Sequence, residues 1–212
     1  MHDLVIYGAG GVGREVAEIV RRINERHRIW NFLGFLDDNE PAGTERENGT
    51  VLGDLEVAVN FERPLDVVIA IARPKSKKQI YEALKPLPHI HFPHIIDRDV
   101  TLSSKVHLEE GVIISHLCSL SLSVTLGRCV FLYTGSNIGH DSVIGDFCSV
   151  LSNVNVSGNV TVNSETLIGS GASILQGLRV GKNSTVGIGA VVLDDVPDNC
   201  TFLGNPAQKL RQ

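Results

Sequence analysis

A six-residue repeat in the second half of the chain constrains its fold more than any other feature. Steps of six residues from Leu102 to Val192 mark sixteen positions, and each of them is Leu, Ile or Val. An α-helix would repeat its buried positions about every 3.6 residues, and an exposed strand about every 2 residues. One deep aliphatic residue in every six instead predicts a triangular coil, with a short strand on each side and a turn at each corner.

Three hexads complete such a coil, so that the aliphatic residues stack in columns inside it. A small or β-branched residue usually stands two positions before the aliphatic residue, and a glycine often follows it, as in Ile138-Gly139 and Ile144-Gly145. We expect these glycines to supply positive φ at the corners, where a Cβ would clash. Coils stack at a strand spacing of about 4.8 Å, and the sixteen hexads predict roughly five coils of a parallel β-helix.

The first part of the chain has a different pattern, in which strand-like and helix-like segments alternate. Strands are predicted over residues 4–7, 30–36 and 66–72, and helices over 14–26 and 74–84. This alternation is typical of a small α/β domain with a parallel sheet. We therefore predict an α/β domain over residues 1–96, a β-helix over 97–195 and a C-terminal cap over 196–212.

A glycine-rich turn links the first predicted strand to the first predicted helix. It comprises Gly8, Gly10, Gly11, Val12 and Gly13, and Asp37 and Asp38 end the next strand. In this context the motif is typical of dinucleotide binding, so an NAD-binding oxidoreductase is one interpretation. The segment has room for only half of a dinucleotide fold. We therefore favour a loop that holds the diphosphate of a nucleotide-sugar at the helix N-terminus, with Asp37 or Asp38 accepting hydrogen bonds from the ribose or the base.

Composition argues against several other partners. The net charge is −5 and the 19 Lys and Arg residues are scattered, which does not suit a nucleic-acid surface. The one dense basic cluster, Lys75, Lys77 and Lys78, is predicted to be a solvated helix face. We see no secretory leader and no apolar run near the ~18 residues of a membrane span. The four cysteines lack CxxC spacing, so we predict neither zinc nor disulfides and expect a reducing, cytoplasmic compartment.

The hexads and the closing Gly204-Asn205-Pro206-Ala207 resemble the hexapeptide-repeat acyltransferases. The whole chain resembles their subfamily of sialic acid O-acetyltransferases and of nucleotide-sugar N-acetyltransferases of the bacillosamine and perosamine pathways. The matching segments are Ile6–Gly13, Phe35–Asp38, Ile69–Ile71, Lys77–Tyr81 and His140–Gly145. The resemblance implies a left-handed parallel β-helix and a homotrimer. It also implies acetyl-CoA as co-substrate, lying between adjacent β-helices, and a nucleotide-sugar held by the N-terminal domain.

Acetyl transfer needs a base, and histidine is the usual one because its pKa lies near the working pH. Three histidines lie in the β-helix, at positions 107, 116 and 140. His140 follows Gly139 at a predicted corner, and Asp141 follows it directly. The resemblance places the family's general base at His140 and its acidic neighbour at Asp141.

The resemblance also implies a path for the coenzyme. The residues that would contact acetyl-CoA are Ser149, Gly158, Ser170, Gly187 and Ile188. The backbone amides of 169–170 or 187–188 are candidates for stabilising the thioester oxyanion. The chain departs from the family pattern in three places: Ser149 and Val12 stand where many relatives have histidine, and Arg73-Pro74 replaces a more usual polar pair after the third predicted strand. We place Arg73 with the substrate-binding residues. These departures leave the acceptor open.

The predicted function is transfer of acetyl from acetyl-CoA to a sugar. The amino group of a nucleotide-linked 4-amino-sugar is our first choice of acceptor, and a sialic acid hydroxyl is the second. A non-catalytic scaffold is an alternative from another class, because many solenoids only bind. A zinc enzyme is disfavoured, since His107 and His116 are nine residues apart and would fall on different faces of an 18-residue coil.

Overall fold

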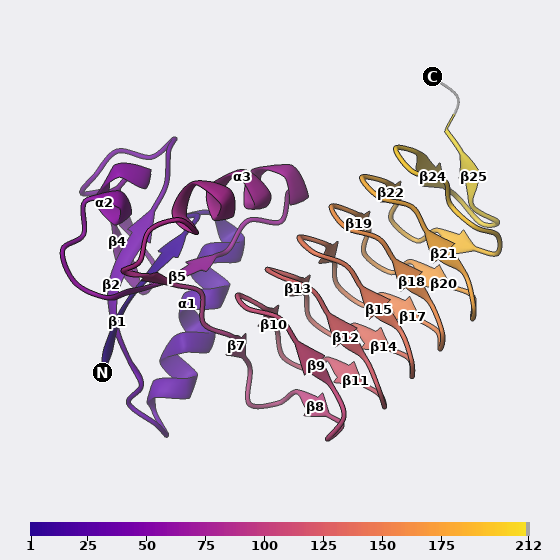
Figure 1. The fold of residues 1–212 in the computed structure, drawn as a ribbon, viewed down its shortest axis with the longest axis horizontal. Helices are drawn as coiled ribbons and strands as arrows, with labels where there is room; N and C mark the ends of the chain where they lie inside the picture. Colours follow the sequence, from indigo (N-terminus) through magenta and orange to yellow (C-terminus); the bar gives the residue numbers. More distant parts are fainter. Residues whose placement is uncertain (211–212) are drawn as a thin grey trace.

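The computed structural model describes residues 1–210 and has two unlike parts, an α/β domain and a β-helix (Figure 1). The α/β domain has a six-stranded sheet in the order β3-β4-β2-β1-β5-β6. Its pairs are parallel except β3 with β4. Its strands are β1 (His2–Tyr7), β2 (Trp30–Leu36), β3 (Glu45–Arg46), β4 (Gly49–Gly53), β5 (Leu65–Ile69) and β6 (Ile90–His91). Its helices are α1 (Gly11–Asn24), α2 (Leu55–Val59) and α3 (Pro74–Leu84).

The sheet is buried on both faces, as expected of a parallel sheet between helices. Alternate residues of β1 point to opposite sides, so Leu4 and Ile6 pack with α1 while Val5 and Tyr7 pack in the cluster that contains α3. The predicted strands and helices in this domain are present. Helix α1, however, begins at Gly11, three residues earlier than predicted, so part of the glycine-rich turn is helical.

Two-residue strands form the three faces of the β-helix. The first face contains β7 (Ile95–Ile96), β10 (Ile113–Ile114), β13 (Phe131–Leu132), β16 (Ser149–Val150), β19 (Leu167–Ile168) and β22 (Thr185–Val186), then β24 (Thr201–Leu203) and β25 (Gln208–Lys209). The second face contains β8 (Thr101–Leu102), β11 (Ser119–Leu120), β14 (Asn137–Ile138), β17 (Asn155–Val156), β20 (Ser173–Ile174) and β23 (Val191–Val192). The third face contains β9 (His107–Leu108), β12 (Thr125–Leu126), β15 (Val143–Ile144), β18 (Thr161–Val162) and β21 (Arg179–Val180).

The hexad prediction is confirmed by the pairing of these strands. Leu120 pairs with Ile138, and Ile138 with Val156, so one coil takes eighteen residues. From Ile114 onward every predicted aliphatic position is at most 3% exposed, whereas Leu102 at the open end is 39% exposed. The interior therefore consists of the columns that the repeat predicts.

The glycines that follow the deep aliphatic residues have a different role from the one predicted. Positive φ occurs two residues later, mostly in residues other than glycine, such as Asp141 and Phe147. A Cβ on Gly139 would lie 2.5 Å from the Gly158 backbone nitrogen, and one on Gly145 would lie 2.7 Å from the Ser164 nitrogen. These glycines are needed because the next coil passes too close for any side chain.

The C-terminal segment closes the far end of the first face. Strand β24 pairs in parallel with β22, and β25 folds back on β24 in an antiparallel pair. Residues 211–212 of the predicted cap lie outside the described residues. The two predicted domain boundaries remain predictions, and β7, the first strand of the β-helix, lies directly before the predicted boundary at residue 97.

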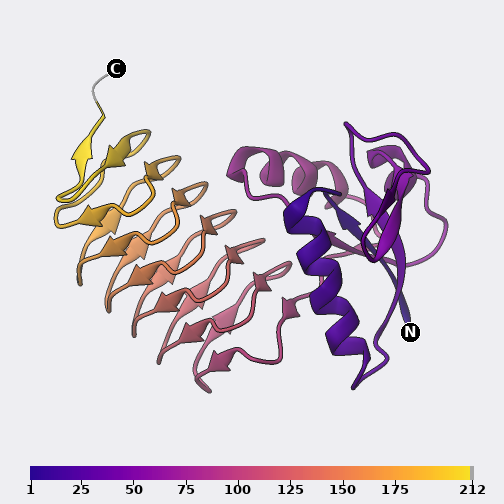
Figure 2. The same ribbon diagram turned by 180° about the vertical axis from the view of Figure 1, so that it is seen from behind.

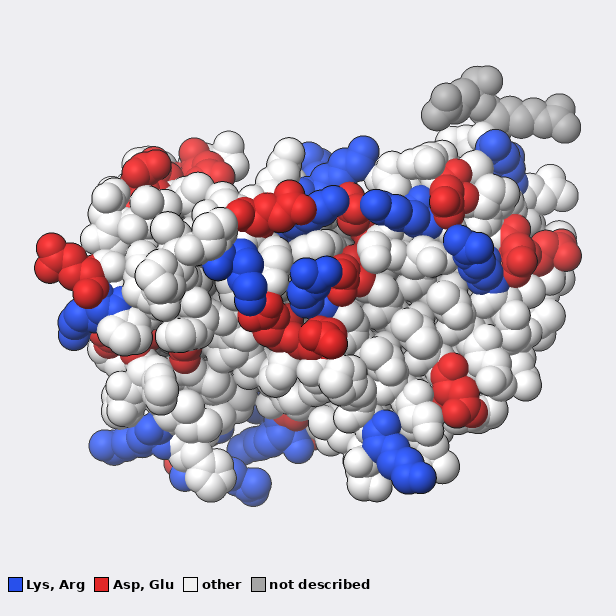
Figure 3. Space-filling view, in the orientation of Figure 1, with Lys and Arg blue, Asp and Glu red and all other residues white. Residues whose placement is uncertain are grey.

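The α/β domain packs against the first coils of the β-helix (Figure 2). Ile113 and Phe131, which point outward from the first face, belong to the same apolar cluster as α1. On the side of α3, Tyr81 meets Phe147 with ring centroids 5.3 Å apart. Charged side chains of both signs gather over the middle of the face shown in Figure 3. An ion pair also joins the domains, between Lys78 of α3 and Glu165 of the β-helix at 3.1 Å. The contact between the domains is therefore both apolar and ionic.

Candidate active site

His140 and Asp141 form a hydrogen-bonded pair at the corner between β14 and β15. The His140 Nδ1 lies 2.8 Å from the Asp141 Oδ2, and both side chains are about half exposed, at 51% and 55%. The backbone of this corner is fixed by the coils on either side. The Asp141 N–H donates to the Leu122 carbonyl at 2.9 Å, and the His140 carbonyl accepts from the Asn159 N–H at 2.8 Å. A rigid scaffold thus presents an imidazole to solvent with one nitrogen already engaged.

Gly158 lies beneath the imidazole ring, one coil further along. A Cβ on Gly158 would be 2.6 Å from His140 Nε2 and 2.7 Å from Cε1. The registers of β11, β14, β17 and β20 align Leu122, His140, Gly158 and Gln176 in one column of corners. Leu122 and Gln176 show that the backbone at this corner accepts side chains. Glycine at position 158 is therefore explained by the space that the His140 ring occupies.

The other two histidines of the β-helix differ from His140. His107 also has an acidic neighbour, but its Nε2 is the atom in contact, 3.1 Å from Glu109 Oε1. His116 lines a cavity of about 290 Å³ between α1 and the corner after β10. A histidine–carboxylate contact alone is thus not distinctive here. His140 is distinguished by an Nε2 that makes no hydrogen bond within residues 1–210 and that lies over a glycine.

The α/β domain contains an open pocket of about 460 Å³, lined by residues that include Tyr7, Asp38, Arg73, Ser76 and Gln79. The Tyr7 hydroxyl donates a short hydrogen bond to Asp38 Oδ1. Burial, and then Asp38 itself, raise the pKa of Tyr7 far above its usual value, so the phenol keeps its proton. The second carboxylate oxygen of Asp38 remains available as an acceptor, and the Arg73 guanidinium supplies positive charge to the same pocket.

Asp37, by contrast, stabilises the glycine-rich turn. Its Oδ2 accepts from the Ala9 N–H and its Oδ1 from the Asn39 N–H, both at 2.9 Å. The predicted choice between Asp37 and Asp38 thus has a geometric basis, because Asp38 alone lines the pocket.

The glycines of the turn serve different purposes. A Cβ on Gly13 would lie 1.7 Å from the Gly8 carbonyl oxygen, so Gly13 lets α1 approach β1 closely, and Gly8 itself has a φ of +110°. A Cβ on Gly10 or on Gly11 would meet no other group within 4 Å, and Gly11 lines a second pocket of about 450 Å³ on the other side of the loop. Val12 is partly buried against the α1 cluster. Substitution of Gly13 would therefore test packing, whereas Gly11 is the position at which to test ligand binding.

The predicted coenzyme residues do not meet at one place within a single chain. Gly158 lies with His140, whereas Ser170, Gly187 and Ile188 lie at corners between the first and second faces. Ser149, on the first face, is fully buried, and its Oγ accepts from Lys77 Nζ at 3.0 Å. Ile188 is 81% exposed. Contact of all five with one coenzyme stays a prediction, and within one chain Ser149 is covered by α3.

The backbone amides proposed for the oxyanion divide into two kinds. The Gly169 and Gly187 N–H groups donate to the Val186 and Phe202 carbonyls, at 2.7 and 2.8 Å, as part of the stacking between coils. Those two amides are thus engaged. Ser170 and Ile188 follow them at the corner and are the candidates that remain.

Comparison with known proteins relates both parts of the chain to one group. The PglD N-terminal domain family matches residues 3–84. The acetyltransferase domain of PglB from Neisseria gonorrhoeae has the same fold with a TM-score of 0.91 at 28% identity, over 99% of this chain and 100% of that one. The chain joins a domain that matches the PglD N-terminal family over residues 3–84 to a β-helix of six-residue repeats. The predicted family resemblance and the predicted fold class are confirmed.

Other solved structures extend this relationship. WeeI from Acinetobacter baumannii is 28% identical with a TM-score of 0.90, over 99% of this chain and 100% of its own. The PglB domain has been solved with acetyl coenzyme A bound. PerB from Caulobacter crescentus, solved with CoA and GDP-perosamine, is 24% identical with a TM-score of 0.88, over 100% of this chain and 98% of its own, a likeness that establishes the fold.

Curated relatives align with this hexapeptide-repeat protein over a shorter segment. The acyl-(acyl-carrier-protein)–UDP-N-acetylglucosamine O-acyltransferase of Pseudomonas aeruginosa is 34% identical over 84 residues, which is 40% of this chain. That alignment spans about a third, 33%, of the relative. Within residues 1–210, no helix is long and apolar enough to cross a membrane, and no three His, Cys, Asp or Glu side chains cluster as metal ligands.

Sequence reasoning missed part of the pocket and misjudged one lysine. Tyr7, Ser76 and Gln79 were not predicted, although Tyr7 directly precedes the glycine-rich turn and could have been considered with it. Lys77 was predicted to lie on a solvated face, but it is 1% exposed and contacts the β-helix. Helical spacing could have separated Lys77 from its exposed neighbour Lys75, because Lys77 stands three, four and seven residues before the apolar Ile80, Tyr81 and Leu84.

Proposed function

We propose that this protein transfers the acetyl group of acetyl-CoA to the amino group of a nucleotide-linked sugar, with His140 as the general base. The observation that carries the proposal is the His140–Asp141 pair, whose free Nε2 lies over Gly158 at a solvent-facing corner. The solved relatives with acetyl-CoA or CoA bound support the acetyl donor. The sialic acid hydroxyl remains the second choice of acceptor.

In the proposed reaction, the amine nitrogen attacks the thioester carbonyl carbon while His140 Nε2 takes a proton from the amine. Asp141 accepts a hydrogen bond from the His140 Nδ1–H. This bond favours the tautomer with a basic Nε2 and stabilises the imidazolium that forms. Collapse of the tetrahedral intermediate breaks the carbon–sulfur bond. The imidazolium returns the proton to the departing thiolate, giving the amide and CoA.

The pocket between Tyr7 and α3 is the proposed site for the nucleotide part of the substrate. This placement differs from the predicted one at the glycine-rich turn, whose glycines do not line this pocket. Arg73 is the N-cap of α3, and the helix N-terminus and the guanidinium both favour the negative charge of a diphosphate. The free oxygen of Asp38 would accept from ribose hydroxyls or from the base. In this scheme residues 1–96 bind the sugar nucleotide, residues 97–195 carry the chemistry, and residues 196–212 cap the β-helix.

We also propose that the protein acts as a homotrimer in a reducing, cytoplasmic compartment. Within one chain the coenzyme residues on the first–second corners are separated from His140, and a neighbouring subunit could bring the two sets together. Closed cyclic symmetry satisfies every such interface equally. Light scattering should give three times the chain mass of 22.9 kDa. An active monomer would contradict the shared site.

The function is tested by incubating the protein with acetyl-CoA and a panel of UDP-, dTDP-, GDP- and CMP-linked amino-sugars, together with free sialic acids. We expect CoA release and one acetamide per turnover with a nucleotide-linked 4-amino-sugar. O-acetylation of a sialic acid would favour the second acceptor. No turnover, combined with no rise in melting temperature on adding CoA, would indicate a scaffold instead of an enzyme.

A further inference from the structure

Lys77 is a buried cation in the contact between α3 and the β-helix. It is 1% exposed, and its Nζ donates to the Cys148 carbonyl and to the Ser149 Oγ, both at 3.0 Å. These partners lie 71 and 72 residues further along the chain, at and beside β16. Lys77 thus joins the two domains through directional hydrogen bonds.

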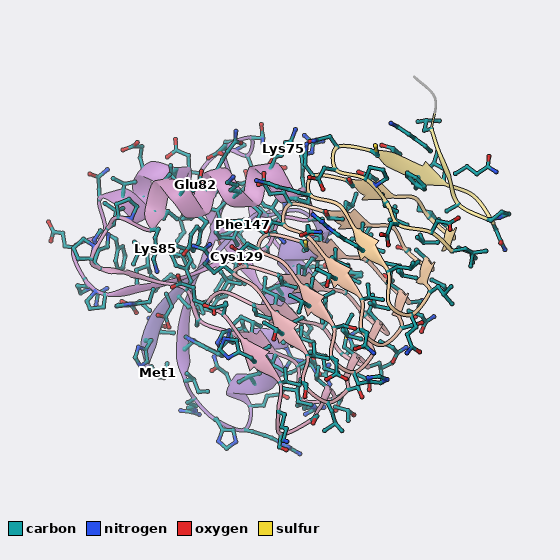
Figure 4. The ribbon with its side chains drawn as sticks, turned by 45° about the vertical axis from the view of Figure 1, so that its right-hand side comes forward. Met1, Lys75, Glu82, Lys85, Cys129 and Phe147 are labelled. Atoms are coloured by element: carbon teal, nitrogen blue, oxygen red, sulfur yellow. The ribbon has the colours of Figure 1, made fainter. Side chains whose placement is uncertain are left out.

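Two nearby lysines, Lys78 in α3 and Lys85 at its C-cap, have carboxylate partners, but Lys77 does not. Lys78 pairs with Glu165, and Lys85, which is labelled in Figure 4, pairs with Glu110. No carboxylate oxygen in residues 1–210 lies within 4.0 Å of Lys77 Nζ. An ammonium buried without a counter-ion costs stability, and apolar residues of similar volume often replace buried charges with no loss. A purely structural role is therefore better served by an apolar side chain.

Two sides of helix α3 contact different parts of the molecule. Lys77 and Tyr81 contact the β-helix, whereas Ser76 and Gln79, on the other side, line the pocket of about 460 Å³ in the α/β domain. A slip of α3 along β16 would therefore change the shape of that pocket and its position relative to the β-helix. Apolar packing tolerates such slips better than hydrogen bonds do, because hydrogen bonds are directional.

We propose that Lys77 is a positioning residue, whose bonds to Cys148 and Ser149 hold α3 in one register and so keep the nucleotide-sugar pocket in its productive place, at a cost in stability. This inference rests on the function proposed for that pocket. It assigns Lys77 no contact with substrate or coenzyme.

The test compares Lys77→Met, which keeps the volume and removes the charge, with Lys75→Met on the exposed side of the same helix. At pH 7 we expect Lys77→Met to melt at the same or a higher temperature than the wild type. The KM for the nucleotide-sugar should rise about tenfold, and the KM for acetyl-CoA should stay within about twofold. Lys75→Met should change neither constant.

The pH dependence of stability gives a second readout. Burial lowers the pKa of Lys77 from 10.5 to about 8, while the Cys129 and Cys148 thiols face it from the β-helix and Lys78 and Tyr81 lie beside it on α3. Between about pH 8 and 10.5, Lys77 is protonated in the unfolded chain but largely neutral in the folded protein. The free energy of unfolding of the wild type should therefore increase with pH in this range, relative to that of Lys77→Met. Below pH 8 the difference in free energy of unfolding between the wild type and Lys77→Met should not change with pH. The free energy of unfolding of Lys75→Met should depend on pH in the same way as that of the wild type.

The outcomes separate this inference from the proposed function. A Lys77→Met protein that loses stability but keeps its KM for the nucleotide-sugar would show a structural lysine and overturn the positioning role. Failure of the proposed function would be seen in the wild type itself, as no turnover of any nucleotide-sugar. A raised KM together with unchanged or higher stability would support the positioning role.

Discussion

Replacement of His140 by alanine should lower kcat by a factor on the order of 10²–10⁴, which is the usual contribution of a positioned general base. The His140 side chain is 51% exposed and supports none of the interior columns, so the melting temperature should change little. The KM for acetyl-CoA should also change little, because coenzyme binding is spread over a long molecule. Steady-state kinetics at saturating nucleotide-sugar, together with thermal unfolding, measures all three quantities.

The β-helix supplies a matched control for this variant. His107 is also exposed and contacts a carboxylate, Glu109, at 3.1 Å, so His107→Ala removes a similar pair from the same scaffold. It should leave kcat unchanged. Asp141→Asn should lose less activity than His140→Ala, since it weakens the orientation of the ring but retains the base. Near-normal kcat in His140→Ala, with an inactive Ser149→Ala, would move the chemistry to Ser149.

The interior of the β-helix was predictable because one periodic signal determines it. Every coil repeats the same environment, so the aliphatic residues from Ile114 to Val192 are buried in the same way. The repeat could not show why glycine follows them. We predicted that these glycines were needed for positive φ. The structure shows that a side chain is instead excluded by the next coil, since a Cβ on Gly139 would lie 2.5 Å from the Gly158 backbone nitrogen. That distance depends on stacking, which involves residues far apart in the sequence.

The contact between the domains had no comparable signal. Helical spacing places Lys77 on the apolar face of α3, but only the docking of α3 on β16 shows that its ammonium is buried there. The same limit applies to Asp37 and Asp38. Both directly follow strand β2, but the Asp37 carboxylate accepts from the Ala9 amide and the Asp38 carboxylate from the Tyr7 hydroxyl. Short motifs predict which segment forms a site, whereas the orientation of individual side chains depends on tertiary packing.

His140 could be proposed from its local motif, but its dependence on Gly158 could not. The two residues are eighteen positions apart and meet because β14 and β17 pair in register, with Asn137 opposite Asn155. The motif-based prediction assigned Gly158 to the coenzyme. The geometry gives it a separate role, which is to leave room for the His140 ring.

Gly158→Ala should therefore reduce kcat on the order of 10²-fold, because a misplacement of a catalytic group by about 1 Å can have an effect of that size. The new Cβ would lie 2.6 Å from His140 Nε2, and the three heavy atoms nearest to it all belong to that ring. The ring can swing outward, so little stability should be lost. Because Leu122 and Gln176 occupy equivalent corners, the backbone should accept alanine.

A double-mutant cycle decides whether Gly158 acts through His140. If it does, adding Gly158→Ala to His140→Ala should cause no further loss of kcat, and the two effects should be strongly non-additive. Gln176→Ala, on the next coil of the same column, serves as the control and should retain wild-type kcat. Full additivity in the cycle would show that Gly158 contributes independently, for example by admitting the coenzyme. A Gly158→Ala protein with normal kcat would show that the position of the ring over Gly158 is not the one used in catalysis.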